Sequence, residues 1–286
     1  MLSNKVSEIM TTNLTTASIA TPIFEVMERM AAEDVGRIIA TDNEVPVGIF
    51  TERDILRRVV NTDIDAKHTS IKEVMTSPIR AVREETHIVE AFGKMFKGKY
   101  RHLMVRGKRG HIVGIVSMRR ILKLAVELGQ GMSETTTLGS LTTSGINTIE
   151  QSLSVYETIN LMVKKGASAV VVADGGNAVG IFTERDVLKR VATKDIDTQK
   201  IAVKEVMTAP LVTMPSTALI GDALSEMYRR DIRNMPVRGE DEKLIGLLSM
   251  SDILQYARAF DIDEKVRRTW KEVAEYLDND DQYTPG

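Results

Sequence analysis

The sequence predicts an α+β protein made of four copies of one small β-α-β-β-α unit, because two motifs and a change of apolar periodicity recur in the same order. The first motif, Gly-Ile-Phe-Thr-Glu-Arg-Asp at 48–54, returns unchanged at 180–186 and in weaker form at 114–120 and 246–252. Its leading glycines stand at positions 48, 114, 180 and 246, so neighbouring copies are 66 residues apart. A fixed period over most of a chain is the signature of a repeat architecture.

The second motif, (Val/Ile)-x-Glu-(Ile/Val)-Met-Thr, opens repeats one, two and four at 6–11, 71–76 and 203–208, and repeat three opens with a degraded version at 137–142. Repeats one and three share the Thr-Glu-Arg-Asp form of the first motif, whereas repeats two and four share a Ser-Met form. This alternation indicates a duplicated pair. We therefore predict two modules of two repeats each, with the seam near 128–137, where Gly129-Gln130-Gly131 interrupts the apolar pattern. The predicted boundaries are 1–66, 67–130, 131–198 and 199–260, followed by a C-terminal helix and tail at 261–286.

The order of elements within a repeat follows from repeat one. Thr21 and Pro22 resemble a helix N-cap and first-turn proline, and apolar residues then recur at helical spacing from 23 to 30. Two short apolar runs at 37–41 and 46–50 flank a polar turn at 42–44, which predicts a hairpin. A second helix is expected over 52–60. The other repeats place their hairpin turns at 106–110, 174–177 and 239–242.

The composition excludes several classes of protein. Hydrophobic residues make up 43% and charged residues 27%, with a formal net charge of −2, so neither a disordered chain nor an overall nucleic-acid footprint is favoured. There is no cysteine, which removes disulfides, thiolate catalysis and cysteine-type zinc sites. Residues 1–10 lack the apolar core of a secretory signal, and the apolar stretches are too short to span a bilayer. We expect a cytoplasmic protein with no membrane partner.

These motifs closely resemble the cystathionine-β-synthase (CBS) domain, over roughly residues 6–258. The resemblance implies that the repeats pair through their sheets into two Bateman modules that form a flat disc, similar to archaeal CBS proteins and to the γ subunit of AMP-activated protein kinase. It also implies clefts that bind AMP, ADP or ATP as a regulatory ligand.

The Ser/Thr-x-x-Asp element is the candidate ligand contact. A carboxylate in the first turn of a helix can accept hydrogen bonds from vicinal ribose hydroxyls, and the free N–H groups at a helix start favour a phosphate. The resemblance implies ribose binding by Asp54, Asp186 and Asp252, with Thr51, Thr183 and Ser249 beside them. On spacing alone, the same residues also fit a helix capping box, and the two roles are compatible.

The resemblance also implies phosphate partners just before the second strand of each repeat. The matching residues are Arg37 in repeat one, Arg101 and His102 in repeat two, and Arg233 with Asn234 in repeat four. Repeat three offers Ser168 and Ala169 there and so lacks a basic residue. Repeat two replaces the aspartate with Arg120, so that site is either empty or altered so that Arg120 contacts the phosphate of a nucleotide held by a neighbouring repeat. Thr11, Thr142 and Thr208 match a threonine that contacts the nucleotide in the family. Arg53 and Arg185 are left open between solvated surface charges and ligand contacts.

The resemblance implies a regulatory, energy-sensing function, and the residues add no sign of catalysis. The four histidines show no metal-type spacing, and no nucleophile–base pair can be read from the chain, so no catalytic residue, metal or catalytic cofactor is expected. A binder of another adenosyl ligand such as S-adenosylmethionine, a nucleic-acid binder and a ligand-free scaffold remain as alternatives. An apolar stripe at 263–278 either docks on the chain itself or binds an effector or a second copy as a homodimer. Repeats one and four are predicted to be the best-equipped sites.

Overall fold

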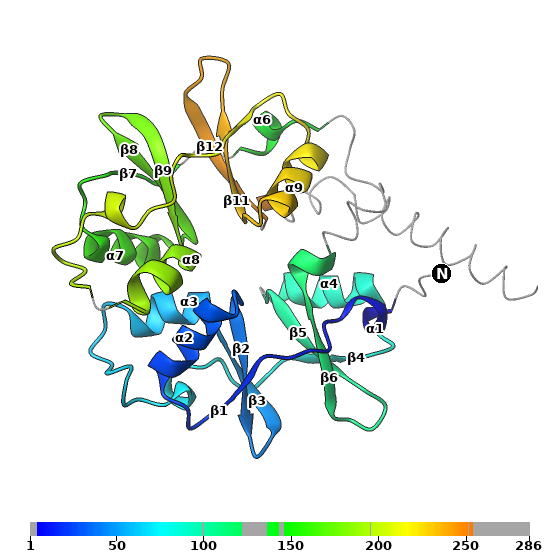
Figure 1. Cartoon of the computed structure of the whole chain (residues 1–286). Coiled ribbons are helices and arrows are strands. Elements are labelled where there is room, and N and C mark those ends of the chain that lie inside the picture. The colour runs from blue at the N-terminus through cyan, green and yellow to red at the C-terminus, as the bar shows by residue number, and fades with distance from the viewer. Residues whose placement is uncertain are drawn as a thin grey trace, which may run out of the picture. The chain divides into compact units, whose positions relative to one another are not determined.

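The computed structural model describes residues 5–98, 100–121, 136–142, 146–194, 196–250 and 252–253, and it has four separate three-stranded sheets, one for each repeat (Figure 1). In each sheet the first strand pairs in parallel with the second, and the second pairs antiparallel with the third. A helix follows the first strand, so the predicted β-α-β-β-α order is confirmed.

The elements of repeats one and two are α1 (Val6–Ile9), β1 (Thr16–Ser18), α2 (Ile23–Ala32), β2 (Arg37–Asp42), β3 (Val45–Thr51), α3 (Glu52–Asp54), η1 (Ile55–Val59), η2 (Ile71–Glu73), β4 (Ala81–Arg83), α4 (Ile88–Lys97), β5 (His102–Arg106) and β6 (Ile112–Ser117). Those of repeats three and four are α6 (Leu138–Leu141), β7 (Thr148–Glu150), α7 (Val155–Lys165), β8 (Ala169–Asp174), β9 (Asn177–Thr183), α8 (Glu184–Asp186), η3 (Val187–Ala192), η4 (Val203–Glu205), β10 (Met214–Pro215), α9 (Ile220–Arg229), β11 (Asn234–Arg238) and β12 (Leu244–Ser249).

The elements predicted for repeat one are present, and the start of its first helix lies one residue later than predicted. Asn43 and Glu44 form the tip of the predicted β2–β3 hairpin, and both have positive φ (47° and 65°), as a tight two-residue hairpin turn requires. Helix α2 starts one residue later than predicted: Pro22 itself occupies the N-cap position, and no side chain caps the helix. The second helix is also present, but after α3 it continues as the π-helical turn η1, which ends at Val59.

The opening motif of each repeat packs on the sheet of another repeat. Thr11, from the opening motif of repeat one, pairs with Ile115 of repeat two. Thr76, the last residue of the opening motif of repeat two, pairs with Ile49 of repeat one. Repeats three and four make the same exchange, since Thr208 pairs with Ile181 of repeat three and Thr142 packs over Gly246 in β12 of repeat four.

This exchange explains why glycine leads the first motif. A Cβ on Gly48 would lie 2.3 Å from the Met75 sulfur, and one on Gly180 would lie 2.5 Å from the Met207 sulfur. The opening methionine therefore fills the space that the glycine leaves.

The chain divides into two compact units. Unit one contains Met1–Asn13, Arg80–Thr143 and Thr213–Gly286, and unit two contains Leu14–Ile79 and Ser144–Val212. Unit two thus combines the main parts of repeats one and three. The boundaries predicted for the single repeats stay predictions.

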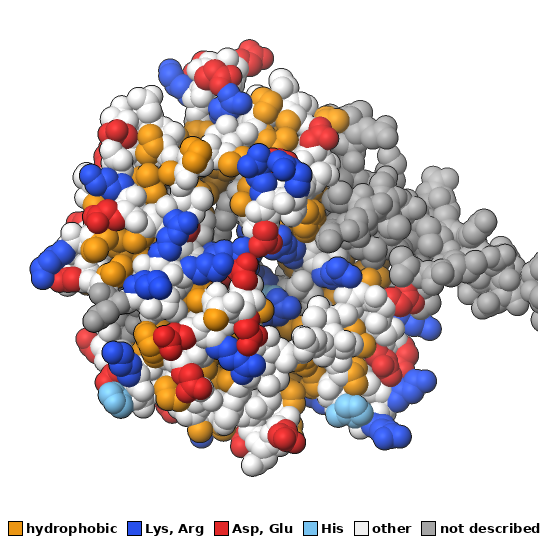
Figure 2. All heavy atoms as spheres, in the orientation of Figure 1, with side chains coloured by type: hydrophobic (Ala, Val, Ile, Leu, Met, Phe, Trp, Pro, Cys, Tyr) orange, Lys and Arg blue, Asp and Glu red, His pale blue; other side chains and the backbone are white. Residues whose placement is uncertain are grey.

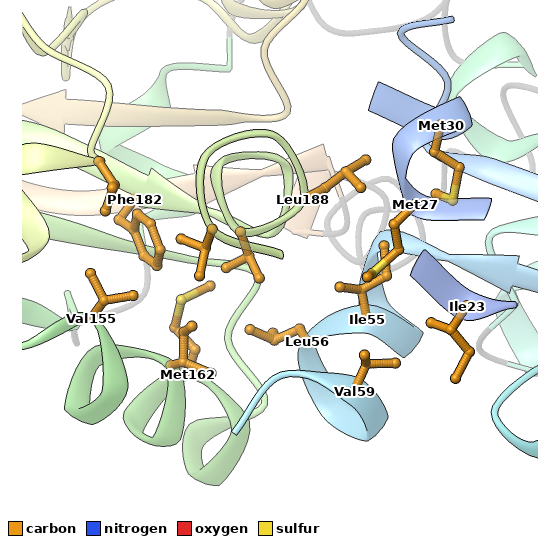
Figure 3. Packing of buried hydrophobic residues seen from close by; sticks show 14 of the residues in the cluster. Ile23, Met27, Met30, Ile55, Leu56, Val59, Val155, Met162, Phe182 and Leu188 are labelled. Carbon is orange, nitrogen blue, oxygen red and sulfur yellow. The ribbon is translucent and has the colours of Figure 1, made fainter. Parts of the chain in front are cut away.

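Unit two has one continuous apolar core. Its buried residues come from both repeats and include Met27, Leu56, Met162, Phe182 and Leu188. Figure 3 shows side chains of η1 and α2 on one side and of α7 and η3 on the other pointing into the same space. Burial of a side chain of this size contributes about 1.5–3 kcal/mol, so repeats one and three stabilise each other.

In the described part of unit one, repeats two and four have separate apolar clusters, one around Met95 and Val105 and one around Leu224 and Val237. The seam at 129–131 and the C-terminal stripe at 263–278 lie outside the described residues. Among the residues that are described, no helix is both long and apolar enough to cross a membrane.

Candidate functional site

The candidate site of repeat one is built on the turn that joins β3 to α3. Thr51 is the N-cap, and its hydroxyl accepts a hydrogen bond from the Asp54 backbone N–H at 3.4 Å. The Asp54 Oδ2 atom in turn accepts from the Thr51 N–H at 2.9 Å and from the Thr51 hydroxyl at 2.7 Å. The capping-box interpretation of this spacing is therefore confirmed, and it fixes the carboxylate at the end of the sheet.

The other carboxylate oxygen faces residues from elsewhere. Thr76, which belongs to the exchanged opening motif of repeat two, donates from its hydroxyl to Asp54 Oδ1 at 3.2 Å. An Arg58 Nη1 atom lies 3.4 Å from the same oxygen and donates to the carbonyls of Val74 and Met75 at 2.7 and 3.0 Å. One aspartate thus connects a helix start, an arginine four residues later and a segment of another repeat.

Repeat three reproduces this geometry. Asp186 Oδ2 accepts from the Thr183 N–H at 2.9 Å and from its hydroxyl at 2.7 Å. Asp186 Oδ1 accepts from the Thr208 hydroxyl at 2.8 Å and lies 3.4 Å from Arg190 Nη1. Arg190 donates to the carbonyls of Val206 and Met207, as Arg58 does to their counterparts. Thr208 is the last residue of the opening motif of repeat four, but its hydroxyl donates to the aspartate of repeat three.

Both aspartates are nearly buried, with 7% of Asp54 and 6% of Asp186 exposed. Burial raises the pKa of Asp54, although hydrogen bonds from Thr51 and the charge of Arg58 act in the opposite direction. The Asp54 carboxylate accepts three hydrogen bonds, two at Oδ2 and one at Oδ1, so a lone pair of Oδ1 remains for one further donor.

The strand register places the predicted phosphate residues at the same end of each sheet. Arg37 stands directly opposite Thr51, and His102 stands opposite Ser117. Arg101 and Arg233 each lie one residue earlier, and their carbonyls accept the N–H groups of Met118 and Met250.

Repeat three has Ala169 opposite Thr183, as the missing basic residue predicts. Arg190 supplies a guanidinium beside the carboxylate instead.

Repeats two and four differ from this pattern. Asp252 accepts from the Ser249 N–H and from its hydroxyl, both at 2.7 Å, so the cap is present in repeat four. In repeat two the Ser117 hydroxyl accepts from the Arg120 N–H at 3.1 Å, and the Arg120 side chain is exposed.

Thr11 and Thr142 both lie in unit one. Thr11 exchanges both of its backbone hydrogen bonds with Ile115 of repeat two. Thr142 takes the place that Met10 holds in repeat two: it covers Gly246 as Met10 covers Gly114. Its hydroxyl donates to the carbonyls of Leu138 and Gly139. The residue that corresponds to Thr11 is then Thr143, which lies outside the described residues.

Arg53 and Arg185 have defined partners. Arg53 Nε lies 3.5 Å from a Glu184 carboxylate oxygen, and Arg185 Nε lies 3.5 Å from one of Glu52. These pairs cross between repeats one and three, so the interpretation as freely solvated charges is wrong.

Sequence reasoning missed Thr76, Arg58 and Arg190. Thr76 was visible in the opening motif, but the exchange that brings it to Asp54 has no local signal. The two arginines follow their aspartates by four residues in both copies, a spacing that pairs side chains on one helix face and could have identified them. Within the described ranges, no three His, Asp or Glu side chains gather as a metal site requires.

Together these features define a class of protein: a chain of paired β-α-β-β-α repeats that carry capped aspartates at the ends of small sheets. The chain belongs to the CBS domain family, whose model matches residues 6–61, 71–127, 138–193 and 203–259. The predicted resemblance is thereby confirmed, as is an α+β fold of four CBS repeats of the Bateman-module type.

The chain is similar to the CBS domain-containing protein CBSCBSPB1 of Arabidopsis thaliana, with 26% identity over 283 residues, 85% of this chain and 52% of the relative. It is also similar to the uncharacterised protein MJ1404 of Methanocaldococcus jannaschii, with 26% identity over 272 residues, 90% of this chain and 62% of the relative. The chain therefore spans about half the length of the plant relatives that it matches.

Among solved structures, protein MJ1225 of Methanocaldococcus jannaschii, described as a proposed archaeal homologue of γ-AMPK, matches with a TM-score of 0.76 and 18% identity over 88% of this chain and 99% of the other. A conserved protein of Pyrococcus horikoshii matches with a TM-score of 0.59 and 19% identity over the same shares of the two chains. These two likenesses concern the fold.

Proposed function

We propose that the chain is a regulatory protein that binds an adenine nucleotide (AMP, ADP or ATP) at the capped aspartates of repeats one and three. One observation carries the proposal: Asp54 and Asp186 each combine a fixed carboxylate, a hydroxyl from another repeat and a guanidinium within 3.4 Å. The description of MJ1225 as a proposed γ-AMPK homologue agrees with this choice of ligand.

The chemistry fits a nucleoside phosphate. The outer oxygen of Asp54 and the Thr76 hydroxyl oxygen are adjacent acceptors, and they suit the two hydroxyls of a ribose diol. Arg37 and Arg58 bring positive charge to the same end of the sheet, and guanidinium groups suit phosphate because they can donate two hydrogen bonds in one plane. This geometry favours repeats one and three, whereas the sequence favoured repeats one and four.

The charge distribution does not favour a long polyanion as the ligand. Over α2, α3 and α7, Figure 2 shows Lys and Arg side chains interspersed with Asp and Glu, and pairs such as Arg29–Glu33 and Lys189–Asp34 neutralise one another. A small ligand that is recognised at a few fixed groups fits this surface better.

Thermal unfolding and calorimetric titration of the full chain with AMP, ADP and ATP test the proposal. A nucleotide at a hundred times its Kd should stabilise the fold by about 2.7 kcal/mol if it binds only the folded state. The double variant Asp54→Asn, Asp186→Asn should lose this gain, because asparagine keeps the size of the side chain but not the charged acceptor.

Glu157→Gln is the matched control. Glu157 forms a capping box with Ser154 at the start of α7, so this variant removes the charge from a cap of the same kind away from the proposed site. It should keep the full nucleotide effect. Stabilisation by S-adenosylmethionine alone, by RNA alone, or by none of these ligands would contradict the proposal and support the corresponding alternative.

A further inference from the structure

Two buried glutamates connect the turns that carry Asp54 and Asp186. Glu52 and Glu184 are 3% and 5% exposed, and each lies two residues before the aspartate of its own repeat. The arginine beside each of them in the chain points to the other repeat: Arg53 pairs with Glu184 and Arg185 with Glu52.

The burial of these carboxylates makes the exchanged arginines important. A carboxylate removed from water is costly unless a cation or several donors compensate it, and the loss of one partner leaves the other as an uncompensated buried charge. Arg185 provides such compensation for Glu52, which lies inside the turn formed by Thr51 and Asp54. The position of one candidate site therefore depends on a residue of the other.

The sequence assigns this arrangement to repeats one and three alone. At the positions of Glu52 and Glu184, repeats two and four carry Met118 and Met250, which cannot form ion pairs. The reciprocal pair is thus encoded in the two repeats whose aspartates, Asp54 and Asp186, form the proposed sites.

We propose that Arg185 is a positioning residue for the Asp54 turn and Arg53 for the Asp186 turn, so that the two sites respond as a coupled pair. The positioning stands on the ion pairs and the burial of the glutamates. The coupling of ligand binding rests on the proposed function.

Amide hydrogen exchange tests the positioning without any ligand. In Arg185→Met, the N–H groups of Thr51 and Asp54, which are bonded within the turn of repeat one, should exchange at least about fivefold faster than in the wild type, the lower end of typical coupling between sites. Exchange should be unchanged in Arg29→Met, which removes an ion pair of α2 within repeat one. Arg185→Lys, which retains the charge, should restore part of the protection.

A double-mutant cycle separates this role from a general loss of stability. If Arg185 acts through Glu52, Arg185→Met should add little to the exchange of these amides in a Glu52→Gln background, where the buried charge is gone. Equal exchange in Arg185→Met and Arg29→Met, or fully additive effects in the cycle, would overturn the proposal.

The coupling of ligand binding is tested by nucleotide titration in an Asp186→Asn background, where binding at Asp186 is removed and binding at Asp54 is measured alone. There Arg185→Met should weaken binding of AMP, ADP or ATP at least about fivefold, while Arg29→Met should not. Unchanged affinity despite faster exchange would overturn the coupling. If the wild type binds none of the three nucleotides, the proposed function fails, and amide exchange still decides the positioning role.

Discussion

Units one and two contain the same repeat in duplicate but join their copies differently. In unit two, repeats one and three share one apolar core, and an arginine of each pairs with a buried glutamate of the other. In the described part of unit one, repeats two and four keep separate clusters. They meet where the Tyr228 hydroxyl donates to the Arg119 carbonyl at 2.7 Å and the Arg119 guanidinium lies beside Asp231 and over the Tyr228 ring.

This difference shows that a repeat does not determine its own partner contacts. The glutamates of unit two become methionines in unit one, and Arg119, which stands at the position of Arg53, pairs with Asp231 after α9 instead of with a glutamate at another helix start. A few positions within an otherwise common fold therefore decide how two copies are held together.

The largest expected effect concerns the shared core. Leu56→Ala should destabilise the chain by about 2–5 kcal/mol, because the side chain is 1% exposed and its removal leaves a cavity. Hydrogen exchange should show lost protection in repeat three as well as in repeat one. The matched variant Leu224→Ala in α9 should affect unit one and leave β8 protected; a loss confined to repeat one in Leu56→Ala would contradict a shared core.

The exchanged threonines give the next effect. Thr208→Val should cost about 1–3 kcal/mol, because the nearly buried Asp186 carboxylate loses a charge-assisted hydrogen bond. Thr142→Val in unit one should cost less, since its hydroxyl donates to carbonyls of its own helix. Urea unfolding of both variants measures the difference, and equal losses would mean that the bond to Asp186 has no special value.

The glycine that leads the first motif is covered by different side chains in the two units: Thr142 covers Gly246 in unit one, and Met75 covers Gly48 in unit two. In unit one, Gly246→Ala would bring a methyl group to within 2.0 Å of the Thr142 Cγ2 atom, and Thr142 is β-branched and held by two hydrogen bonds. We expect a loss of about 1–3 kcal/mol from this overpacking. In unit two, Gly48→Ala meets the flexible Met75 thioether and should cost less. Thermal unfolding of the two variants decides, and a larger loss for Gly48→Ala would reverse the interpretation.

The smallest effect is a pH dependence of opposite sign in the two units. Hydrogen bonds and charge from Arg229 and Arg230 lower the pKa of Glu226 to about 2. The ionised Glu226 side chain therefore stabilises the fold above its usual pKa of 4.5, and this stabilisation is lost as the pH falls toward 2. Burial raises the pKa of Asp54 above its usual 3.8, so its protonated form favours the fold below that pH, and this advantage is lost as the pH rises through the raised pKa.

Urea unfolding between about pH 6 and about pH 3 measures both effects as differences from Glu226→Gln and Asp54→Asn. On acidification, the free energy of unfolding of the wild type should fall relative to that of Glu226→Gln. Relative to that of Asp54→Asn, it should rise. The same sign for both differences would refute one of the two assignments.

Much of the fold could be predicted because its signals are local. The hairpin at Asn43 and Glu44, the apolar face of α2 and the capped turn at Asp54 each depend on a few neighbouring residues. The 66-residue spacing of the signature glycines then predicted the same elements in the other three repeats.

The rest depends on contacts between distant segments, which local patterns do not encode. Thr76 meets Asp54 because the opening motif crosses to another sheet, and Glu52 meets Arg185 because repeats one and three pack together. The degraded opening motif of repeat three lacks the methionine that would mark its phase, and only the packing of Thr142 over Gly246 shows that Thr142 corresponds to Met10.

The exchanged opening motifs also bear on how such a chain is inherited. A gene segment cut at the sequence period would encode a sheet without the side chain that covers its glycine, together with an opening motif that has no sheet to join. A single copy could complete itself only by trading that motif with a second molecule. The smallest part of this architecture that covers its own signature glycines is therefore a pair of repeats, either within one chain or between two.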